Sequence, residues 1–253
     1  MKARDILKII CSVLLIALMC VSGYQISHTQ TQYQQEALQH QALLAYKPAR
    51  ELTMFVPNAP SGVALLRQEY PDVVGWLEIT GTRIDYPFVL AENNDKYLRS
   101  DLEGNYLLAG SLFMDYRCTP DFNLFNTIIY GHNIKNGSMF GTLPSFRDAD
   151  FFARHAEGTI HLEDTEYRLE IFACVLTNRY DGMIYNSLQE SEMDKQLFLR
   201  YVRDNAAQYR DIGVSTEDMI VTLSTCSYEF ADARTVLIGR LVAATEAIAL
   251  ESI

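Results

Sequence analysis

The stretch VTLSTCSYEFADARTVLIGRL, residues 221–241, contains two apolar runs rich in β-branched residues, separated by a short polar segment. Runs of this composition, bounded by polar residues, are typical of β-strands. Cys226 ends the first run and Arg234 opens the second. The stretch therefore predicts two neighbouring strands joined by a loop, with a thiol and a guanidinium at their facing ends.

The same pattern extends upstream as far as residue 73. Short runs rich in Val, Ile, Tyr, Phe and Thr recur between turns. About eight such runs within about 170 residues predict a mainly β protein with some helix, folded as a closed β-barrel or a sandwich. The runs are residues 73–79, 83–89, 111–116, 126–131, 158–163, 167–177, 219–225 and 234–242.

Two helices are expected beside these strands. Residues 187–208 carry apolar side chains at helical spacing, and Ser191 or Ser187 can cap the start of the helix. A shorter helix, residues 63–70, ends before Pro71, because a proline disfavours helical backbone in the residue before it. The longer helix lies in the connection that precedes the last two strands.

The N-terminus carries a second strong signal. Residues 9–35 contain no Asp, Glu, Lys or Arg, and their apolar part is about long enough to span a bilayer. Three basic residues, Lys2, Arg4 and Lys8, precede it, which by the positive-inside rule places the N-terminus in the cytoplasm. We predict an uncleaved membrane anchor at residues 1–26; a cleaved signal peptide and a buried core helix are the alternatives.

The segment after the anchor connects it to the β-rich part. It begins with a stretch rich in Gln, Ala and Leu, typical of a helical stalk, and prolines then break the helical pattern. We expect stalk and linker at residues 27–62 and one extracytoplasmic domain at residues 63–253. The 49% apolar composition of the 253-residue chain is enough for one sizeable core. The chain is thus predicted to be a single-pass protein of the cell membrane.

The charge and the metal-ligand spacing exclude some partners. The net charge is −11, whereas non-specific binding of nucleic acid needs a basic surface to neutralise phosphates. No CxxC or His/Cys spacing typical of zinc is present. We therefore expect no nucleic-acid partner, no metal ion and no cofactor.

The cysteines point to one reactive thiol. Cys11 and Cys20 lie in the apolar segment, so three cysteines remain for the exported part, and at least one of them is unpaired within the chain. Cys174, in the middle of a strand, suits a buried thiol, and Cys118, in a probable loop, suits a free surface thiol. Cys226, at a strand end, suits a cleft.

A nucleophilic thiol needs a nearby base or cation, usually a histidine. His132 ends an apolar run in the motif YGHN and opens a polar loop, where it can face a cleft or serve as a hydrogen-bonded turn residue. Arg234 stays protonated and can bind a carbonyl or an oxyanion. It can equally pair with Asp232 or Glu229 at a strand edge.

Taken together, these motifs resemble those of sortases. TLSTC at residues 222–226, followed by Arg234, is similar to the sortase active-site signature, and YGHN at residues 130–133 is similar to the sortase histidine motif. The order of anchor, His, Cys and Arg also matches, and the resemblance covers roughly residues 63–242. Four further segments are similar to class B sortases: residues 74–89, 93–105, 110–117 and 136–143.

The resemblance implies a sortase-type closed β-barrel of about eight strands and a membrane-anchored cysteine transpeptidase of Gram-positive bacteria. Cys226 would attack the carbonyl of a threonine in a C-terminal sorting signal, and an amine of the cell wall or of its lipid-linked precursor would resolve the thioacyl-enzyme. His132 would act as general acid and base, and Arg234 would stabilise substrate carbonyls or the oxyanion. Class B resemblance suggests a sorting motif of the Asn/Ser/Pro-Pro-x-Thr type. The residues expected to line the substrate groove are Ser224, Thr225, Ile184 and Tyr185.

Three other functions compete with this one. A papain-like endopeptidase places Cys before His, whereas His132 precedes Cys226 here. A membrane-tethered binding module of the β-sandwich type would leave Cys226, His132 and Arg234 apart in space. A pilin-polymerising sortase often has a second hydrophobic anchor, for which residues 241–253 are too short and too interrupted by Glu.

Overall fold

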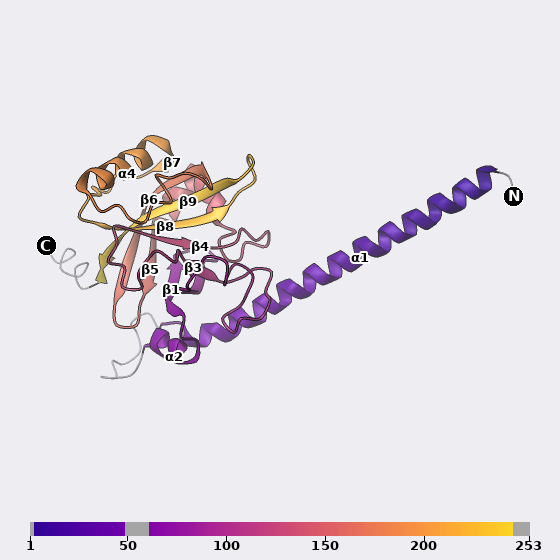
Figure 1. Ribbon diagram of the computed structural model, residues 1–253, viewed down its shortest axis with the longest axis horizontal. Coiled ribbons are helices and arrows are strands. Elements are labelled where there is room, and N and C mark those ends of the chain that lie inside the picture. Colours follow the sequence, from indigo (N-terminus) through magenta and orange to yellow (C-terminus); the bar gives the residue numbers. More distant parts are fainter. Residues whose placement is uncertain (1–2, 49–60, 245–253) are drawn as a thin grey trace. The chain divides into compact units, whose positions relative to one another are not determined.

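The computed structural model describes residues 3–48 and 61–244 of the chain (Figure 1). It contains two compact units, Met1–Ala42 and Leu43–Ile253. The linker prolines at positions 57 and 60 lie outside the described residues.

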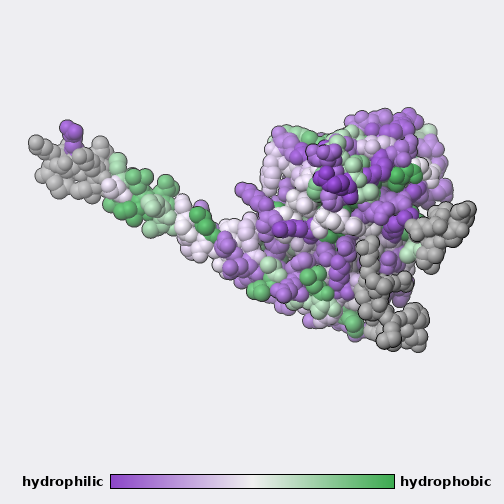
Figure 2. Space-filling model, turned by 180° about the vertical axis from the view of Figure 1, so that it is seen from behind, coloured by the Kyte–Doolittle hydropathy of each residue, from purple (hydrophilic) through white to green (hydrophobic). Residues whose placement is uncertain are grey.

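The first unit consists of the long helix α1, Ala3–Leu43, whose last residue belongs to the second unit. The large apolar side chains described between Ile10 and Ile26 are exposed, and Figure 2 shows apolar side chains of the helix in green. The stretch Ile10–Tyr46 contains an 18-residue window with a mean hydropathy of 1.9, so it is long and apolar enough to cross a membrane by length and composition. The helix continues from the predicted anchor into the predicted stalk, and the 3₁₀ turn η1, Leu44–Tyr46, follows it.

The second unit is a nine-stranded sheet in which eight strands close into a barrel. The order is β5-β1-β2-β3-β4-β8-β9-β6, and β6 pairs again with β5, which closes the ring. This confirms the predicted closed barrel of about eight strands; β7 lies outside the ring, on β6. The strands are β1 Val73–Ile79, β2 Asp85–Val89, β3 Leu112–Met114, β4 Asn126–Tyr130, β5 Glu157–His161, β6 Glu166–Asn178, β7 Ala206–Tyr209, β8 Met219–Cys226 and β9 Ala233–Ala243.

Short helices fill the connections of the barrel. The predicted N-terminal helix is present as α2, Gly62–Glu69, and the helix before the last two strands as α4, Glu192–Asn205. The Ser191 side chain caps α4 by accepting a hydrogen bond from the backbone of Asp194, at 3.1 Å. Two further elements are the 3₁₀ helix η2, Leu143–Arg147, and α3, Ala149–Arg154.

The predicted end of the long helix was wrong. Of the two predicted caps the helix uses Ser191, so it begins later than residue 187, and it ends before residues 206–209, which form strand β7. Three of these four residues pair with β6, where Cys174 lies opposite Gln208. Pairing with a neighbouring strand satisfies their backbone groups, and this outweighs the local helical preference of Ala and Gln.

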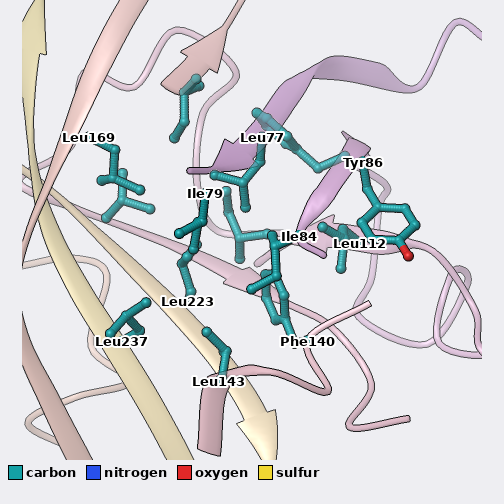
Figure 3. Packing of buried hydrophobic residues seen from close by; sticks show 14 of the residues in the cluster. Leu77, Ile79, Ile84, Tyr86, Leu112, Phe140, Leu143, Leu169, Leu223 and Leu237 are labelled. Atoms are coloured by element: carbon teal, nitrogen blue, oxygen red, sulfur yellow. The ribbon is translucent and has the colours of Figure 1, made fainter. Parts of the chain in front are cut away.

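The barrel interior holds the largest hydrophobic cluster. Figure 3 shows Leu77 and Ile79 of β1 directed toward Leu223 of β8 and Leu237 of β9. Strand β8 is buried on both faces, because Leu223 faces the interior while Ile220 packs in a second cluster with residues of α4. This explains why apolar residues occupy both faces of β8, interrupted only by the buried Thr222 before Ser224 and Thr225. Burial falls at the two ends of the strand, at Met219 and at Cys226.

The expectation of a surface thiol at Cys118 was wrong. Its side chain is buried, and its sulfur accepts a hydrogen bond from the backbone N–H of Ile128 at 3.5 Å. The loop that contains Cys118 folds back over β4 and covers the thiol, which raises its pKa through burial. Cys174 is fully buried in β6, as its mid-strand position predicts.

Candidate active site

Cys226 and Arg234 are direct partners in the last two strands. β8 pairs with β9 in antiparallel register, and the final pair of this ladder is Cys226 with Arg234. Directly opposed residues in such a ladder have Cα atoms about 4.5–5.5 Å apart and side chains on the same face. The loop between the strands closes through a bond from the Ser227 N–H to the Ala233 carbonyl, at 3.0 Å.

His132 reaches the same edge from the other side of β8. β4 runs parallel to β8, and Tyr130 at its end pairs with Ser224. His132 and Cys226 each follow this pair by two residues, so register brings them to neighbouring strand ends. A glycine is needed at position 131, between Tyr130 and His132, because a Cβ there would lie 2.4 Å from the Leu112 side chain of β3.

Three hydrogen bonds hold the histidine loop against the end of β8. The Gly131 N–H donates to the Ser224 carbonyl at 3.1 Å, and the Thr225 hydroxyl donates to the Gly131 carbonyl at 2.7 Å. The Asn133 side-chain amide then donates to the carbonyl of Cys226 at 2.8 Å. The residues on both sides of His132 are thus bonded to the strand that carries the thiol.

The imidazole of His132 is oriented by a backbone carbonyl. Its Nε2 lies 2.7 Å from the carbonyl oxygen of Leu98. A carbonyl only accepts hydrogen bonds, so Nε2 carries the proton and Nδ1 is the basic nitrogen of the neutral ring. Burial lowers the pKa of His132 below its ordinary value, although the bond to Leu98 opposes this shift.

The guanidinium of Arg234 is only partly engaged. Its Nη1 donates to the carbonyls of Ala233 at 2.9 Å and of Asp232 at 3.3 Å. Nε and Nη2 make no hydrogen bond to the described residues. Arginine therefore keeps donors available beside the thiol, and the predicted alternative of an ion pair with Asp232 or Glu229 is not formed in the described structure. Glu229 instead pairs with Arg147.

These three residues line one cleft of about 380 Å³. Its floor and walls come from the ends of β4, β8 and β9, the loop before β3 and the loop between β6 and α4. The lining residues are Asn94, Leu98, Phe113, Asp115, Arg117, Tyr130, Gly131, His132, Arg179, Tyr180, Asp181, Gly182, Tyr185, Ser224, Thr225, Cys226 and Arg234. A cleft that brings a thiol, an imidazole and a guanidinium together can perform acyl transfer.

Three of the four residues predicted for the substrate groove lie at this cleft. Ser224 and Thr225 line its floor, and the hydroxyl of Tyr185 lies 2.8 Å from the Ser224 hydroxyl. Burial raises the pKa of Tyr185 to about 12, so this phenol stays protonated at neutral pH. Ile184 is fully buried in the cluster beneath α4 and does not line the cleft.

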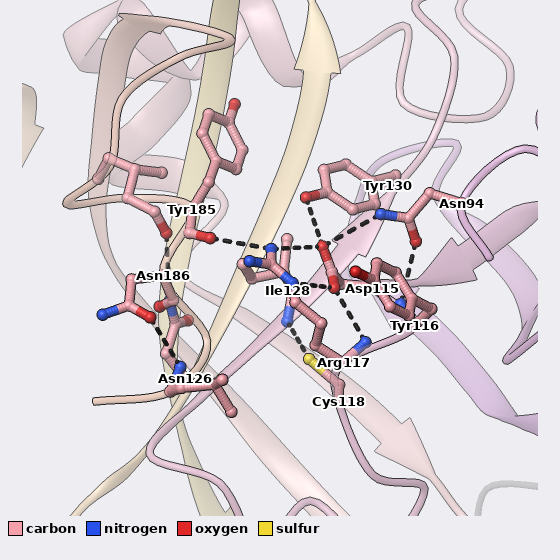
Figure 4. Close-up of polar contacts among 12 residues, drawn as sticks. Asn94, Asp115, Tyr116, Arg117, Cys118, Asn126, Ile128, Tyr130, Tyr185 and Asn186 are labelled. Carbon is pink, nitrogen blue, oxygen red and sulfur yellow. Dashed lines mark hydrogen bonds and ion pairs between the residues drawn. The ribbon is translucent and has the colours of Figure 1, made fainter. Parts of the chain in front are cut away.

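No role was predicted from the sequence for one group of polar residues at the cleft. The carboxylate of Asp115 binds Arg117, Tyr130 and Asn94, as Figure 4 shows, and we call these four residues the Asp115 network. Asp115 and Arg117 lie in the segment GSLFMDYR and Asn94 in NNDKYLRSDLEGN. Both segments are similar to segments of class B sortases, and this similarity was the one sequence feature that could have indicated a role at the site.

Within residues 3–48 and 61–244, no group of three or more His, Cys, Asp or Glu side chains is placed to hold a metal ion.

Comparisons with known proteins show which family this chain belongs to. No protein-family model matches the chain. The chain is 40% identical to sortase B of Listeria monocytogenes over 173 residues, which is 68% of this chain and 70% of that protein. The crystal structure of sortase B from B. anthracis superposes with a TM-score of 0.74 at 32% identity, over 84% of this chain and 99% of that one.

A second solved structure is a Streptococcus pyogenes class B sortase involved in pilus biogenesis. It shares 38% identity and a TM-score of 0.63, over 68% of this chain and 93% of that chain. Sequence identity above 30% across most of a relative, with the same barrel, shows common family membership. The chain belongs to the class B sortases, which are cysteine transpeptidases.

Proposed function

We propose that Cys226, His132 and Arg234 carry out transpeptidation at the described cleft. The observation that supports this most strongly is the strand register. It places Cys226 opposite Arg234 on β9 and beside the His132 loop that follows β4. Three neighbouring strand ends thus present a nucleophile, a proton carrier and an oxyanion donor to one peptide bond.

In the first half-reaction the thiol of Cys226 gives its proton to Nδ1 of His132, and the sulfur attacks the threonine carbonyl of the sorting signal. The oxyanion that forms lies beside the guanidinium of Arg234, whose Nε and Nη2 can donate to it. When the carbon–nitrogen bond breaks, the imidazolium returns the proton to the departing amine. A thioester between the substrate and Cys226 remains.

In the second half-reaction an amine of the cell wall or of its lipid-linked precursor attacks this thioester. The imidazole accepts a proton from the incoming amine, and the Cys226 thiolate leaves. The product is a new amide bond, and the imidazolium of His132 then returns its proton to the Cys226 thiolate, which restores the starting state of the enzyme. The orientation of Nε2 toward Leu98 supports Nδ1 as the nitrogen that handles the proton in both steps.

The substrate is a secreted protein that bears a C-terminal signal of the Asn/Ser/Pro-Pro-x-Thr type. The shape of the cleft supports an extended peptide with its threonine at Cys226 and its upstream residues along Ser224, Thr225 and Tyr185. Ile184 is fully buried and is not part of this groove.

The likeness to a pilus-associated class B sortase supports a second candidate acceptor, the lysine amine of a pilin subunit. A competition between a diaminopimelate-containing stem peptide, a triglycine peptide and a lysine peptide distinguishes the acceptors. We expect transfer to a cell-wall amine; exclusive transfer to the lysine peptide would instead assign pilus assembly.

The helix α1 supports a single membrane anchor with a cytoplasmic N-terminus and an outward-facing catalytic domain. Protease treatment of intact cells tests this topology. We expect the barrel to be degraded and an epitope at the N-terminus to be protected. Protection of both would contradict the topology.

The enzymatic function is tested with the full-length protein in detergent micelles and a panel of sorting-signal pentapeptides. We expect cleavage after threonine and, with an added amine, a transpeptidation product. Cys226→Ala should abolish both, while Cys118→Ser keeps them. Activity of the Cys226→Ala protein would refute the assignment of the nucleophile.

A further inference from the structure

The strongest feature that the catalytic proposal does not use is the buried carboxylate of Asp115. Its side chain is 0% exposed, although atoms of the residue border the cleft. It directly follows β3, and its backbone is fixed by a bond from its N–H to the Ile128 carbonyl at 2.9 Å. A buried charge is costly unless it is paired and fully hydrogen-bonded, so its presence at a cleft calls for a physical explanation.

Arg117 provides the charge that compensates Asp115. Its Nε donates to Oδ1 at 2.7 Å and its Nη2 to Oδ2 at 2.8 Å, and its backbone N–H donates to Oδ1 at 3.0 Å. Burial alone would raise the pKa of Asp115, but these bonds outweigh it and hold the pKa below its ordinary value. The pair is therefore ionised, and a forked geometry of this kind fixes the plane of the guanidinium.

Two neutral side chains complete the coordination of the carboxylate. The Tyr130 hydroxyl donates to Oδ2 at 3.0 Å, and the Asn94 amide donates to the same oxygen at 3.2 Å. Five donors thus meet one carboxylate, which offers about four lone-pair sites. Asp115 has no capacity left for a substrate, whereas the side chains of Arg117, Tyr130 and Asn94 all line the cleft.

The network also reaches the opposite wall of the cleft. Nη2 of Arg117 makes a second bond, at 3.0 Å, to the backbone carbonyl of Tyr185 in the loop before α4. The ring of Tyr185 stacks against that of Tyr130 with 6.2 Å between centroids, and its hydroxyl meets Ser224. One buried carboxylate therefore connects the loop at Asn94, the end of β4 and the loop before α4 (Figure 4).

We propose that Asp115 is a positioning residue of the sortase cleft: its buried carboxylate fixes Arg117, Tyr130 and Asn94, and through Arg117 the Tyr185 loop, in the arrangement that receives the sorting peptide. Nη1 of Arg117 makes no hydrogen bond to the described residues, so it is the donor left for a peptide carbonyl. Asp115 acts on peptide binding and not on the thiol. This inference rests on the transpeptidase function proposed above.

The test compares Asp115→Asn with wild type in the full-length protein, using a pentapeptide that the wild type cleaves. Asparagine keeps the shape but removes the charge and places an N–H₂ group against other donors. We expect KM to rise about tenfold or more, as for the loss of a charge-assisted bond, while kcat changes less than about threefold. The rate at which iodoacetamide alkylates Cys226 should stay within about twofold of wild type, because the catalytic residues are untouched.

Glu170→Gln is the matched control. Glu170 also pairs with an arginine: its Oε2 accepts two hydrogen bonds from Arg240, at 2.9 and 2.6 Å. It lies on β6 and outside the cleft lining. We expect it to lower the melting temperature without a change in KM. A normal KM in folded Asp115→Asn would overturn the proposal. So would a parallel loss of kcat, alkylation rate and melting temperature, since that pattern belongs to general destabilisation.

If Asp115→Asn does not fold, Tyr130→Phe and Arg117→Lys provide the test. Each removes one or two bonds to Asp115, and each should raise KM by about threefold to tenfold. An unchanged KM in both would overturn the proposal. Failure of the wild type to cleave any peptide would refute the proposed function instead, so the two failures are distinguishable.

Discussion

The proposed catalytic residues, Cys226, His132 and Arg234, line the same cleft as the Asp115 network but are held by different interactions. The proposed catalytic residues are positioned by strand register and by bonds to backbone carbonyls, at Leu98 for His132 and at Ala233 for Arg234. The Asp115 network is positioned by side chains that bind one another.

This difference has a chemical reason. A side chain that must react or bind an oxyanion has to keep part of its bonding capacity, so its position comes from the backbone around it. A carboxylate that only orients its neighbours can use every lone pair, as Asp115 does. Changes among the catalytic residues should therefore lower kcat, and changes in the Asp115 network should raise KM.

The largest effect is expected for His132→Gln. Loss of the proton carrier should reduce kcat by about 10²–10⁴-fold, the usual contribution of general acid–base catalysis. Steady-state kinetics with a fluorogenic pentapeptide measure this. Retention of kcat within tenfold would show that another group moves the proton.

Arg234→Ala should reduce kcat by about 10²–10³-fold, as for removal of an oxyanion donor. The melting temperature should change little, because the guanidinium bonds only to its own loop in the described structure. Arg234→Lys should recover part of the activity, since lysine keeps the charge but lacks the planar fork. An arginine with a purely structural role would give the reverse, with a lower melting temperature and normal turnover.

Asn133→Ala tests whether bonds to backbone carbonyls position the proposed catalytic residues. The variant loses the 2.8 Å bond to the Cys226 carbonyl. We expect kcat to fall about tenfold with KM nearly unchanged. Asn136→Ala, in the same loop, removes only a local turn bond to Ser138 and serves as the control. Equal effects of the two variants would argue that the loop as a whole, and not the bond to Cys226, matters.

The last prediction concerns how the stability conferred by Asp115 depends on pH. Its pKa is held below the ordinary value of 3.8, so ionisation stabilises the folded state above that pH. Asp115→Asn should cost roughly 2–3 kcal/mol at neutral pH, and this difference from wild type should shrink as pH falls below 3.8 through the depressed pKa. Urea unfolding from about pH 7 to about pH 3 measures it. If the difference in free energy of unfolding between wild type and Asp115→Asn grew toward acid pH, Asp115 could not be ionised in the folded protein.

Local sequence patterns were enough to predict most strands of the fold. Each predicted run became a strand of the barrel, because β-branched and aromatic residues between turns favour strands and burial in the barrel supports the same state. Cys226, His132 and Arg234 could be singled out as candidates because each stands at the edge of an apolar run, and the resemblance to sortase motifs then implied their roles. That the three meet at one cleft depends on β4 lying parallel to β8, which no local pattern encodes.

What the sequence could not predict depends on packing between distant segments. Residues 206–209 look helical but pair with β6, and Cys118 looks exposed but is covered by its own loop. Ile184 stands beside Tyr185 in the chain, yet its side chain points into the core beneath α4. Asp115 was overlooked for the same reason, since its Tyr130 and Asn94 partners come from other segments.

Strand register leads us to expect that Cys226 carries the acyl group of the substrate at this cleft. The decisive experiment is mass spectrometric peptide mapping of the enzyme, quenched in acid during turnover of a sorting pentapeptide. We predict an acyl adduct on Cys226 that disappears when an amine acceptor is added. An adduct on Cys118 or Cys174, or peptide turnover without any thioacyl adduct, would refute this assignment.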